Sequence, residues 1–159
     1  MKYINELIER LEDKKIGIHR STKEQMQSLY FIVDGKKLPM AYVEFMDVMG
    51  NGTENGFMGG DSCFMDEIHD LKQGAIELLQ ENESENVLND EDFVFWMSQG
   101  CMFCFFNLKE GDNPPVYFYN ESGDDKFIKI ADSLVEFLIN RFERNKTTFR
   151  EKKNLIHIV

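Results

Sequence analysis

The sequence predicts an α+β fold, in which helices flank a mostly antiparallel sheet within a single domain covering residues 1–159. Three short aromatic runs between Phe93 and Asn120 alternate with turn residues, a pattern typical of an antiparallel meander. Amphipathic helical patterns precede and follow this region. A chain of 159 residues, 42% of them hydrophobic and 13% aromatic, is large enough for a real core and has a globular composition.

Two helices are predicted in the first part of the chain. Apolar residues recur at helical spacing in Tyr3–Leu11. Ser21 and Glu24 fit a capping box that begins a second helix, whose apolar stripe includes Met26, Leu29 and Tyr30. The stretch from Leu29 to Val33 is apolar and rich in β-formers, so it is compatible either with the end of that helix or with a strand.

A third helix is predicted to start at Pro39, because its fixed φ suits the first helical turn. Its apolar face, with Tyr42 and Phe45, ends at the glycine-containing turn 50–52. Phe57–Phe64 is expected to form a short strand and Met65–Gln80 a helix. An acidic loop then leads into the meander.

The strands of the meander are predicted at Phe93–Met97, Cys101–Leu108 and Val116–Asn120. In the second strand Phe103 and Phe105 share one face, and Met102, Cys104 and Phe106 share the other. Since both faces are apolar, this strand is expected to be central and covered on both sides. A polar catalytic surface is difficult to build there, which favours a packed domain that presents its outer surface over an enzyme.

The end of the chain is predicted to contain a last strand, Phe127–Ile130, and a helix capped by Asp132 or Ser133. The tail, 145–159, is basic and then apolar. This pattern is compatible with either an additional strand or a mobile end.

The charge of the chain is strongly acidic and unevenly distributed. The net charge is −11, which argues against non-specific nucleic-acid binding because phosphates require Lys and Arg. Ten acids and one lysine between Asp66 and Asp92 leave that segment at −9, whereas six bases and two acids between Arg141 and Lys153 leave +4. These charges either solvate the surface or steer a basic partner. The candidate contacts for a partner are Asp66, Glu67, Asp70, Asp90, Glu91 and Asp92.

The sequence favours a cytoplasmic protein without a membrane segment. No apolar run approaches the ~18 residues of a spanning helix, and the charged N-terminus lacks the apolar core of a secretory signal. Three cysteines, an odd number, fit a reducing compartment.

Two motifs could carry chemistry, and each has a simpler structural explanation. Cys101 and Cys104 are three apart in a predicted strand, so they point to opposite faces and no second pair completes a zinc site. Asp66, His69 and Asp70 share one side of a predicted helix and could form a metal or acid–base site. A solvated acidic helix start explains them equally. We therefore expect no cofactor, metal or catalytic residue.

A resemblance appears in the order of several short patterns. Leu38-Pro39-x-x-Tyr42-x-x-Phe45 and the turn at 50–52 resemble the signature of the SUKH superfamily, which includes fungal Smi/Knr cell-wall-assembly regulators and many bacterial immunity proteins. Three later pieces add to it, namely Phe93-x-Phe95 with Gly100, Gly111-Asp112-x-Pro114-Pro115, and Ala131-x-Ser133-x-x-x-Phe137-Leu138. The resemblance spans about 21–142 and leaves the helix 3–11 and the tail outside.

This resemblance implies an α+β domain without catalysis, and its signature residues are structural and assign no site. In bacteria it implies an immunity protein that binds a toxin domain, often a nuclease. The acidic band suits a basic nuclease domain, and we expect a monomer or weak homodimer. An intracellular regulatory scaffold without a toxin partner is the alternative. A hydrolase that uses Asp66, His69 and Asp70 is a third hypothesis.

Overall fold

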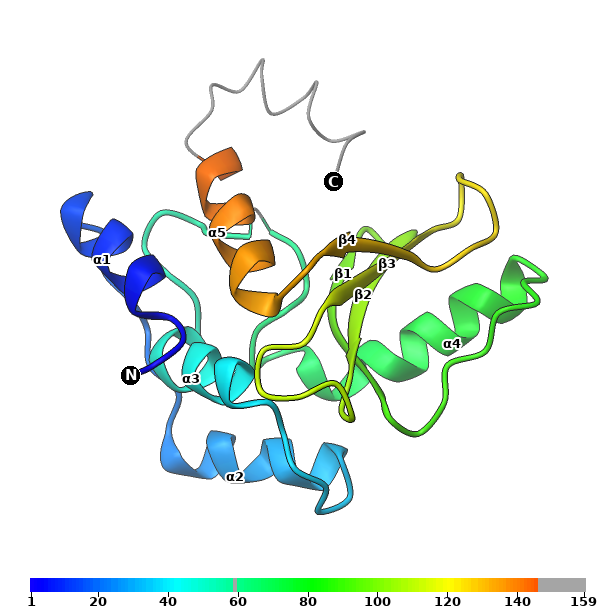
Figure 1. The fold of residues 1–159 in the computed structure, drawn as a ribbon, viewed down its shortest axis with the longest axis horizontal. Helices are drawn as coiled ribbons and strands as arrows, with labels where there is room; N and C mark the ends of the chain where they lie inside the picture. Colours follow the sequence, from blue (N-terminus) through cyan, green and yellow to red (C-terminus); the bar gives the residue numbers. More distant parts are fainter. Residues whose placement is uncertain (59, 146–159) are drawn as a thin grey trace.

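A four-stranded antiparallel sheet and helices on both of its faces make up the part of the chain that the structure, a computed structural model, describes: residues 1–58 and 60–145 (Figure 1). The helices are α1 (Asn5–Asp13), α2 (Lys23–Ile32), α3 (Met40–Met49), the 3-10 helix η1 (Ile68–Asp70), α4 (Leu71–Glu81) and α5 (Leu134–Asn145). The strands are β1 (Asp92–Ser98), β2 (Met102–Asn107), β3 (Val116–Asn120) and β4 (Ile128–Ala131). The predicted α+β class is confirmed. The predicted tail from residue 146 onward lies outside the described residues.

The sheet is the predicted meander, with strand order β1-β2-β3-β4. Each neighbouring pair is antiparallel, and Phe103 of β2 stands opposite Met97 of β1 and Tyr119 of β3. The strand β2 is central, and the side chains from Phe103 to Phe106 are buried on both of its faces. Its predicted position is therefore confirmed.

Helices cover the two faces of the sheet. On the face of Met97, α4 approaches so closely that a Cβ added at Gly74 would lie 3.6 Å from the Met97 sulfur. On the other face α3 and α5 pack against the aromatic residues. The Tyr42 ring lies 5.3 Å from that of Phe106, and Phe137 lies 5.3 Å from Phe95. No helix among the described residues is long and apolar enough to span a bilayer.

The N-terminal helix belongs to the same core, although it lies outside the pattern that the resemblance covers. Ile4, Leu7 and Leu11 are at most 1% exposed. No side chain of α1 caps its own start. Instead the buried carboxylate of Glu44, on α3, accepts hydrogen bonds from the backbone N–H of Tyr3 (2.8 Å) and of Ile4 (3.3 Å). A residue of α3 thus satisfies two backbone donors that immediately precede α1.

The start of α2 differs by one residue from the prediction. The cap is Thr22, whose hydroxyl accepts from the Gln25 N–H at 3.1 Å while Gln25 Oε1 accepts from the Thr22 N–H at 2.8 Å. Ser21 instead donates to the Met46 carbonyl at 2.6 Å and ties this segment to α3. The ambiguous apolar stretch after Leu29 continues as helix to Ile32.

The predicted strand at 57–64 is wrong. The described residues of this segment form turns at 57, 58 and 60 and no strand, and Ser62 makes an isolated bridge to Met97 at the edge of β1. Positive φ angles at Gly56, Met58 and Gly60 interrupt the extended backbone that a strand requires. The helix predicted from Met65 starts later, as η1 followed by α4, but Leu71 and Ala75 face the core as expected.

Candidate functional site

One small hollow of the surface lies between two segments that carry exposed acids. Asp66, Glu67 and Asp70 are exposed at the start of η1 and α4, and Asp90 is exposed just before β1. The hollow between these segments and the end of α2 is lined by Ile32, Val33, Ile68, His69, Lys72, Asp90, Asp92, Phe93, Val94 and Leu108. The structure therefore brings both ends of the predicted acidic stretch to the same region, next to α2.

Two lysines reduce the charge at the Asp90 end of this region. Lys36, from the α2–α3 connection, places its Nζ 3.2 Å from Glu91 Oε1. Lys72 donates to the Asn89 carbonyl at 2.7 Å, and its partial burial lowers its pKa. Glu91 is thus half-buried and paired. Asp66, Glu67, Asp70 and Asp90 form no ion pair with any residue in the described ranges.

Asp92 has a different environment from the two acids before it, because its side chain is only 7% exposed. Its Oδ2 accepts from the Asn89 N–H at 3.0 Å, and its Oδ1 accepts from Asn107 Nδ2 at 3.0 Å. It starts β1 opposite Asn107. Asp92 therefore stabilises the entry into the sheet, and we exclude it from the candidate contacts.

The side chain of His69 contacts α2 rather than forming a cluster with Asp66 and Asp70. Its Nε2 lies 3.1 Å from Ser28 Oγ. That hydroxyl already donates its one proton to the Gln25 carbonyl at 2.6 Å, so His69 must be the donor in the contact. This geometry does not activate Ser28 as a nucleophile. Within the described residues no group of three or more His, Cys, Asp or Glu side chains could hold a metal ion.

The two cysteines of the Cys-x-x-Cys pattern occupy different environments. Cys104 is buried in β2, where burial raises the pKa of its thiol well above the usual value. Cys101 lies in the turn before β2 rather than in the strand, and its thiol contacts the Ser98 carbonyl at 3.6 Å. Because Cys101 lies in a turn and Cys104 is buried in the strand, the two thiols do not form a paired site.

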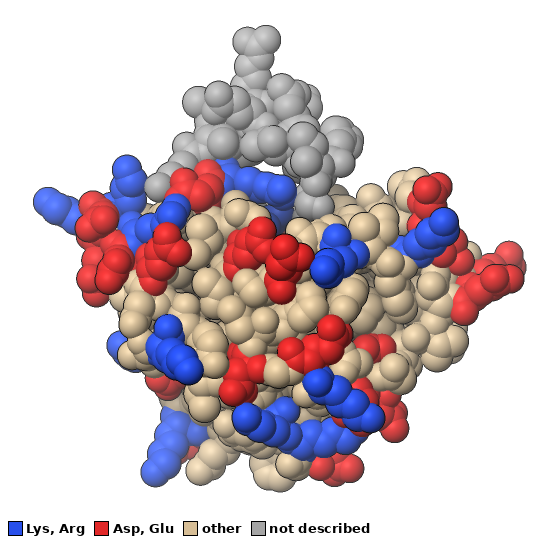
Figure 2. Space-filling model, in the orientation of Figure 1, with Lys and Arg blue, Asp and Glu red and all other residues tan. Residues whose placement is uncertain are grey.

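A second acidic group lies at the far end of α4. The β3–β4 turn, with Asp124 and Asp125, packs against the loop that follows α4. Asp125 Oδ2 accepts from the Glu85 N–H at 3.2 Å, and its carbonyl accepts from Asn86 Nδ2 at 2.9 Å. Hydrogen bonds, first from Ser84, lower the pKa of Asp125. Figure 2 shows acidic side chains at this end of the molecule. This group could not be predicted from the sequence pattern, because its two parts are about forty residues apart in the chain.

A buried polar cluster ties the 57–67 segment to the sheet and to α5. Asp61 Oδ2 accepts from Trp96 Nε1 at 3.0 Å and from Arg141 at 2.7 Å. The Arg141 guanidinium also lies 5.2 Å from the centre of the Trp96 ring. Burial raises the pKa of Asp61, and the hydrogen bonds with Ser98 and the charge of Arg141 oppose this shift. Arg141 is therefore a structural cation and does not belong to an exposed basic end.

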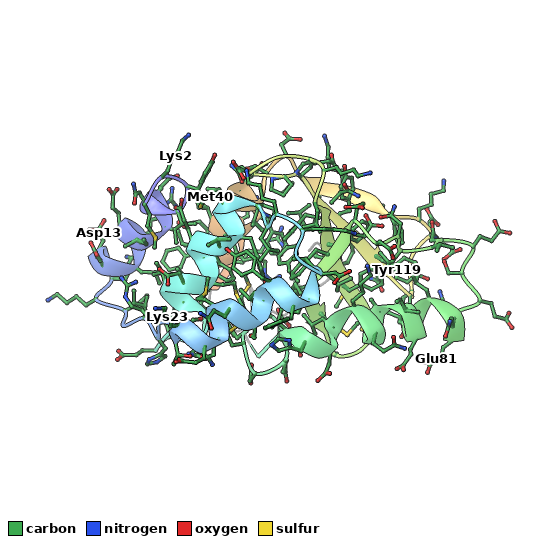
Figure 3. The ribbon with its side chains drawn as sticks, turned by 90° about the horizontal axis from the view of Figure 1, so that it is seen from below. Lys2, Asp13, Lys23, Met40, Glu81 and Tyr119 are labelled. Carbon is green, nitrogen blue, oxygen red and sulfur yellow. The ribbon has the colours of Figure 1, made fainter. Side chains whose placement is uncertain are left out.

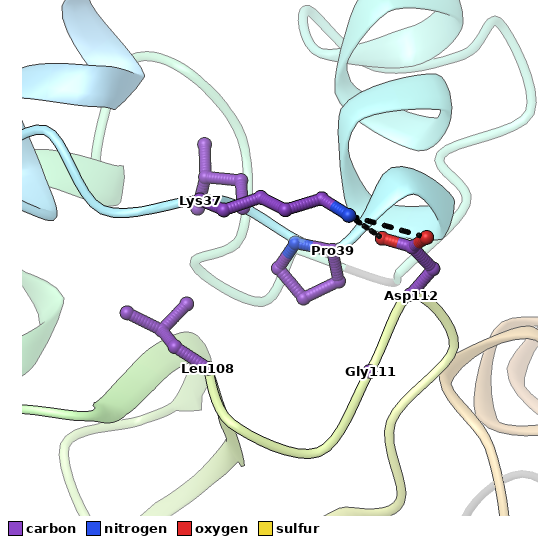
Figure 4. Close-up of a pocket in the computed structure, with 6 residues that line it drawn as sticks. Lys37, Pro39, Leu108, Gly111 and Asp112 are labelled. Carbon is purple, nitrogen blue, oxygen red and sulfur yellow. Dashed lines mark hydrogen bonds and ion pairs between the residues drawn. The ribbon is translucent and has the colours of Figure 1, made fainter.

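The signature residues meet at the start of α3 (Figure 4). Pro39 is the N-cap and supplies no side-chain acceptor. Asp112, from the β2–β3 loop, replaces it: its Oδ1 accepts from the Met40 N–H at 3.1 Å and its carbonyl accepts from the Ala41 N–H at 2.9 Å. The Met40 bond, followed by the bond from Lys37, lowers the pKa of the Asp112 carboxyl. The Leu38-Pro39 and Gly111-Asp112 patterns are thus two halves of one helix cap.

Both hollows described here are small. The one beside Lys37 and Asp112 encloses about 90 Å³, and the one beside His69 about 30 Å³. Sites for small molecules typically enclose ~300–1,000 Å³. These two hollows therefore suit water or a single partner side chain better than a substrate.

Comparison with protein families matches residues 35–138 to SUKH_6, described as SMI1-KNR4 cell-wall. The match includes the whole pattern from Leu38 to Leu138 and starts later than the predicted 21. A comparison with curated proteins found no match. Since the matched segment covers more than half of the chain and the fold agrees, the chain belongs to the SUKH_6 family of SMI1-KNR4 domains.

Proposed function

We propose that this protein is an immunity protein that binds and neutralises a cognate toxin, with a basic nuclease domain as the target. The observation that carries the proposal is that Asp66, Glu67 and Asp70 are exposed without an ion pair in the described ranges, while Asp90 borders the hollow that Ile68 and His69 line beside the end of α2. Membership of the SUKH_6 family is compatible with such a role and with protein binding.

Charge complementarity explains why a nuclease fits this surface. A nuclease binds phosphates through a basic groove, and the same groove attracts carboxylates. Asp66, Glu67 and Asp70 supply exposed carboxylates that form no ion pair within the described residues, and Asp90 adds a fourth whose charge Lys72 partly offsets. The net charge of −11 adds long-range attraction toward a basic partner. Such an inhibitor acts where the toxin meets its nucleic-acid substrate, so we place it in the cytoplasm.

The test is protection of cells by co-expression. Each nuclease domain encoded by a gene that neighbours this one is expressed alone, with the parent protein, and with a variant in which Asp66, Asp70 and Asp90 are changed to Lys. We expect growth with the parent and reduced growth with the variant. Purified parent should also inhibit the toxin at a 1:1 ratio. If the parent restores neither growth nor inhibition, the proposal is wrong.

A regulatory scaffold without a toxin partner is the second candidate, and the cell-wall description of the family favours it. The same surface would then bind a basic segment of a cellular protein. If no toxin gene neighbours this gene and its deletion causes a cell-wall defect, the scaffold would be favoured over the immunity protein.

A further inference from the structure

We infer that Phe31, supported by Tyr30, is the apolar anchor that inserts into a recess of the basic partner surface. This inference rests on the proposed function and identifies the centre of the binding face. Phe31 is 84% exposed and Tyr30 is 43% exposed, on a helix whose other side carries the buried Leu29. An aromatic side chain that is mostly in water contributes little to folding, and exposed aromatic residues are frequent at binding surfaces.

The position of α2 brings its end close to the segments that carry the exposed acids. Ser28, one helical turn before Phe31, contacts His69, which lies between Asp66 and Asp70 in the chain. Ile32, the next residue, lines the hollow that Asp90 also borders. In Figure 3, which views this side, α2 ends where α4 begins. Phe31 thus belongs to the end of α2 that packs beside η1 and the loop of Asp90, and Tyr30 extends its apolar surface outward.

This combination specifies the chemistry of the occupant. An apolar centre with a charged rim is the usual organisation of a protein interface, and aromatic residues often carry most of its energy. The carboxylates on the rim select a basic surface, and Phe31 needs an apolar recess within it. A nucleic acid is excluded by the charge, and a small molecule would leave the rim unused. The partner is therefore a basic protein domain with a hydrophobic pocket.

The two parts of the face should affect different rate constants. Rim charges act at a distance, so they mainly set the association rate and its salt dependence. A desolvated anchor forms its contacts only in the docked complex, so its loss mainly accelerates dissociation. If α2 served only the fold, substitution of Phe31 would change neither the association rate constant nor the dissociation rate constant.

The experiment measures binding of a catalytically inactivated form of the nuclease domain that the co-expression test identifies, with this protein immobilised on the sensor surface. The variants are Phe31→Ala and, as a matched control, Ile128→Ala, since Ile128 is a 51% exposed apolar residue on β4. We expect Phe31→Ala to raise the Kd at least ~30-fold through faster dissociation, and to leave the melting temperature unchanged. Ile128→Ala should stay within about twofold of the parent.

Each other outcome overturns the inference in a distinguishable way. Equal binding by Phe31→Ala and the parent rejects the anchor and leaves the immunity function intact. Failure of the parent itself to bind the domain rejects the proposed function and the anchor with it. If sedimentation shows a dimer of the parent that Phe31→Ala abolishes while toxin binding persists, the occupant is a second copy of the chain.

Discussion

The substitution Phe45→Ala tests whether the signature residues carry the fold or a binding site. Phe45 is 1% exposed on α3, with its ring 6.5 Å from that of Tyr42 and 6.4 Å from that of Phe64. Truncation removes the transfer free energy of the ring and leaves a cavity beside Tyr42 and Phe64, at a cost of ~3–5 kcal/mol. A domain of this size unfolds with only ~5–15 kcal/mol, so a large share of its stability would be lost.

Chemical and thermal unfolding measure this loss directly. For a domain of this length, ~1 kcal/mol corresponds to ~2–4 °C, so the melting temperature should fall by roughly 6–20 °C. Phe31→Ala is the matched control, because the same atoms are removed from a side chain that is 84% exposed. It should change the free energy of unfolding by no more than about 0.5 kcal/mol. An equal urea midpoint for Phe45→Ala and the parent would show that the packing argument is wrong.

Three further predictions concern the hydroxyl of Tyr42, the carboxylate of Asp112 and the exposed acids. Tyr42 is fully buried, and its hydroxyl has no hydrogen-bond partner among the described residues, so Tyr42→Phe should leave the urea midpoint unchanged or raise it. The pKa of the Asp112 carboxyl is lowered in the folded state, so its stabilisation of α3 is present above the unfolded pKa of about 3.8 and is lost as the pH falls through the folded pKa. Asp112→Asn should therefore make the free energy of unfolding less dependent on pH below ~4. Charge reversal of Asp66 and Asp90 should slow association with the toxin domain at low salt and leave the melting temperature nearly unchanged, whereas reversal of buried Asp92 should destabilise the fold.

Much of the fold could be predicted because its hydrophobic periodicity is strong. The bounds of β3 agree with the prediction from Val116 to Asn120, and the two faces of β2 carry the residues expected. The strand prediction for 57–64 failed because turns with positive φ bury the apolar residues of this segment. Composition does not distinguish such turns from a short strand. The cap of α2 moved by one residue because Ser21 and Thr22 have the same capping chemistry.

The candidate site was less predictable, since it depends on which neighbours surround similar side chains. Asp90, Glu91 and Asp92 are adjacent acids in the sequence, yet one is exposed, one is paired with Lys36 and one is buried against Asn107. Lys36 lies more than fifty residues before its partner, so a count along the acidic segment could not include it. Tyr30 was placed on the apolar stripe, but its exposure of 43% puts it on the outer flank of α2.

The division of residues between fold and surface explains why the family pattern assigns no binding site. Leu38, Tyr42 and Phe45 are at most 2% exposed, and Asp112 is committed to the start of α3. A partner cannot contact these buried groups without unfolding the helix that they hold. The side chains left for recognition are those that the core does not constrain, namely the acids beside η1 and the aromatic pair of α2. In the proposed binding face, α2 precedes the matched segment 35–138, whereas Asp66, Asp70 and Asp90 lie inside it at exposed positions. Both parts should be needed for recognition: transplanting the exposed residues of α2 together with these acids onto a related domain should transfer toxin binding, whereas transplanting the α3 signature should transfer none.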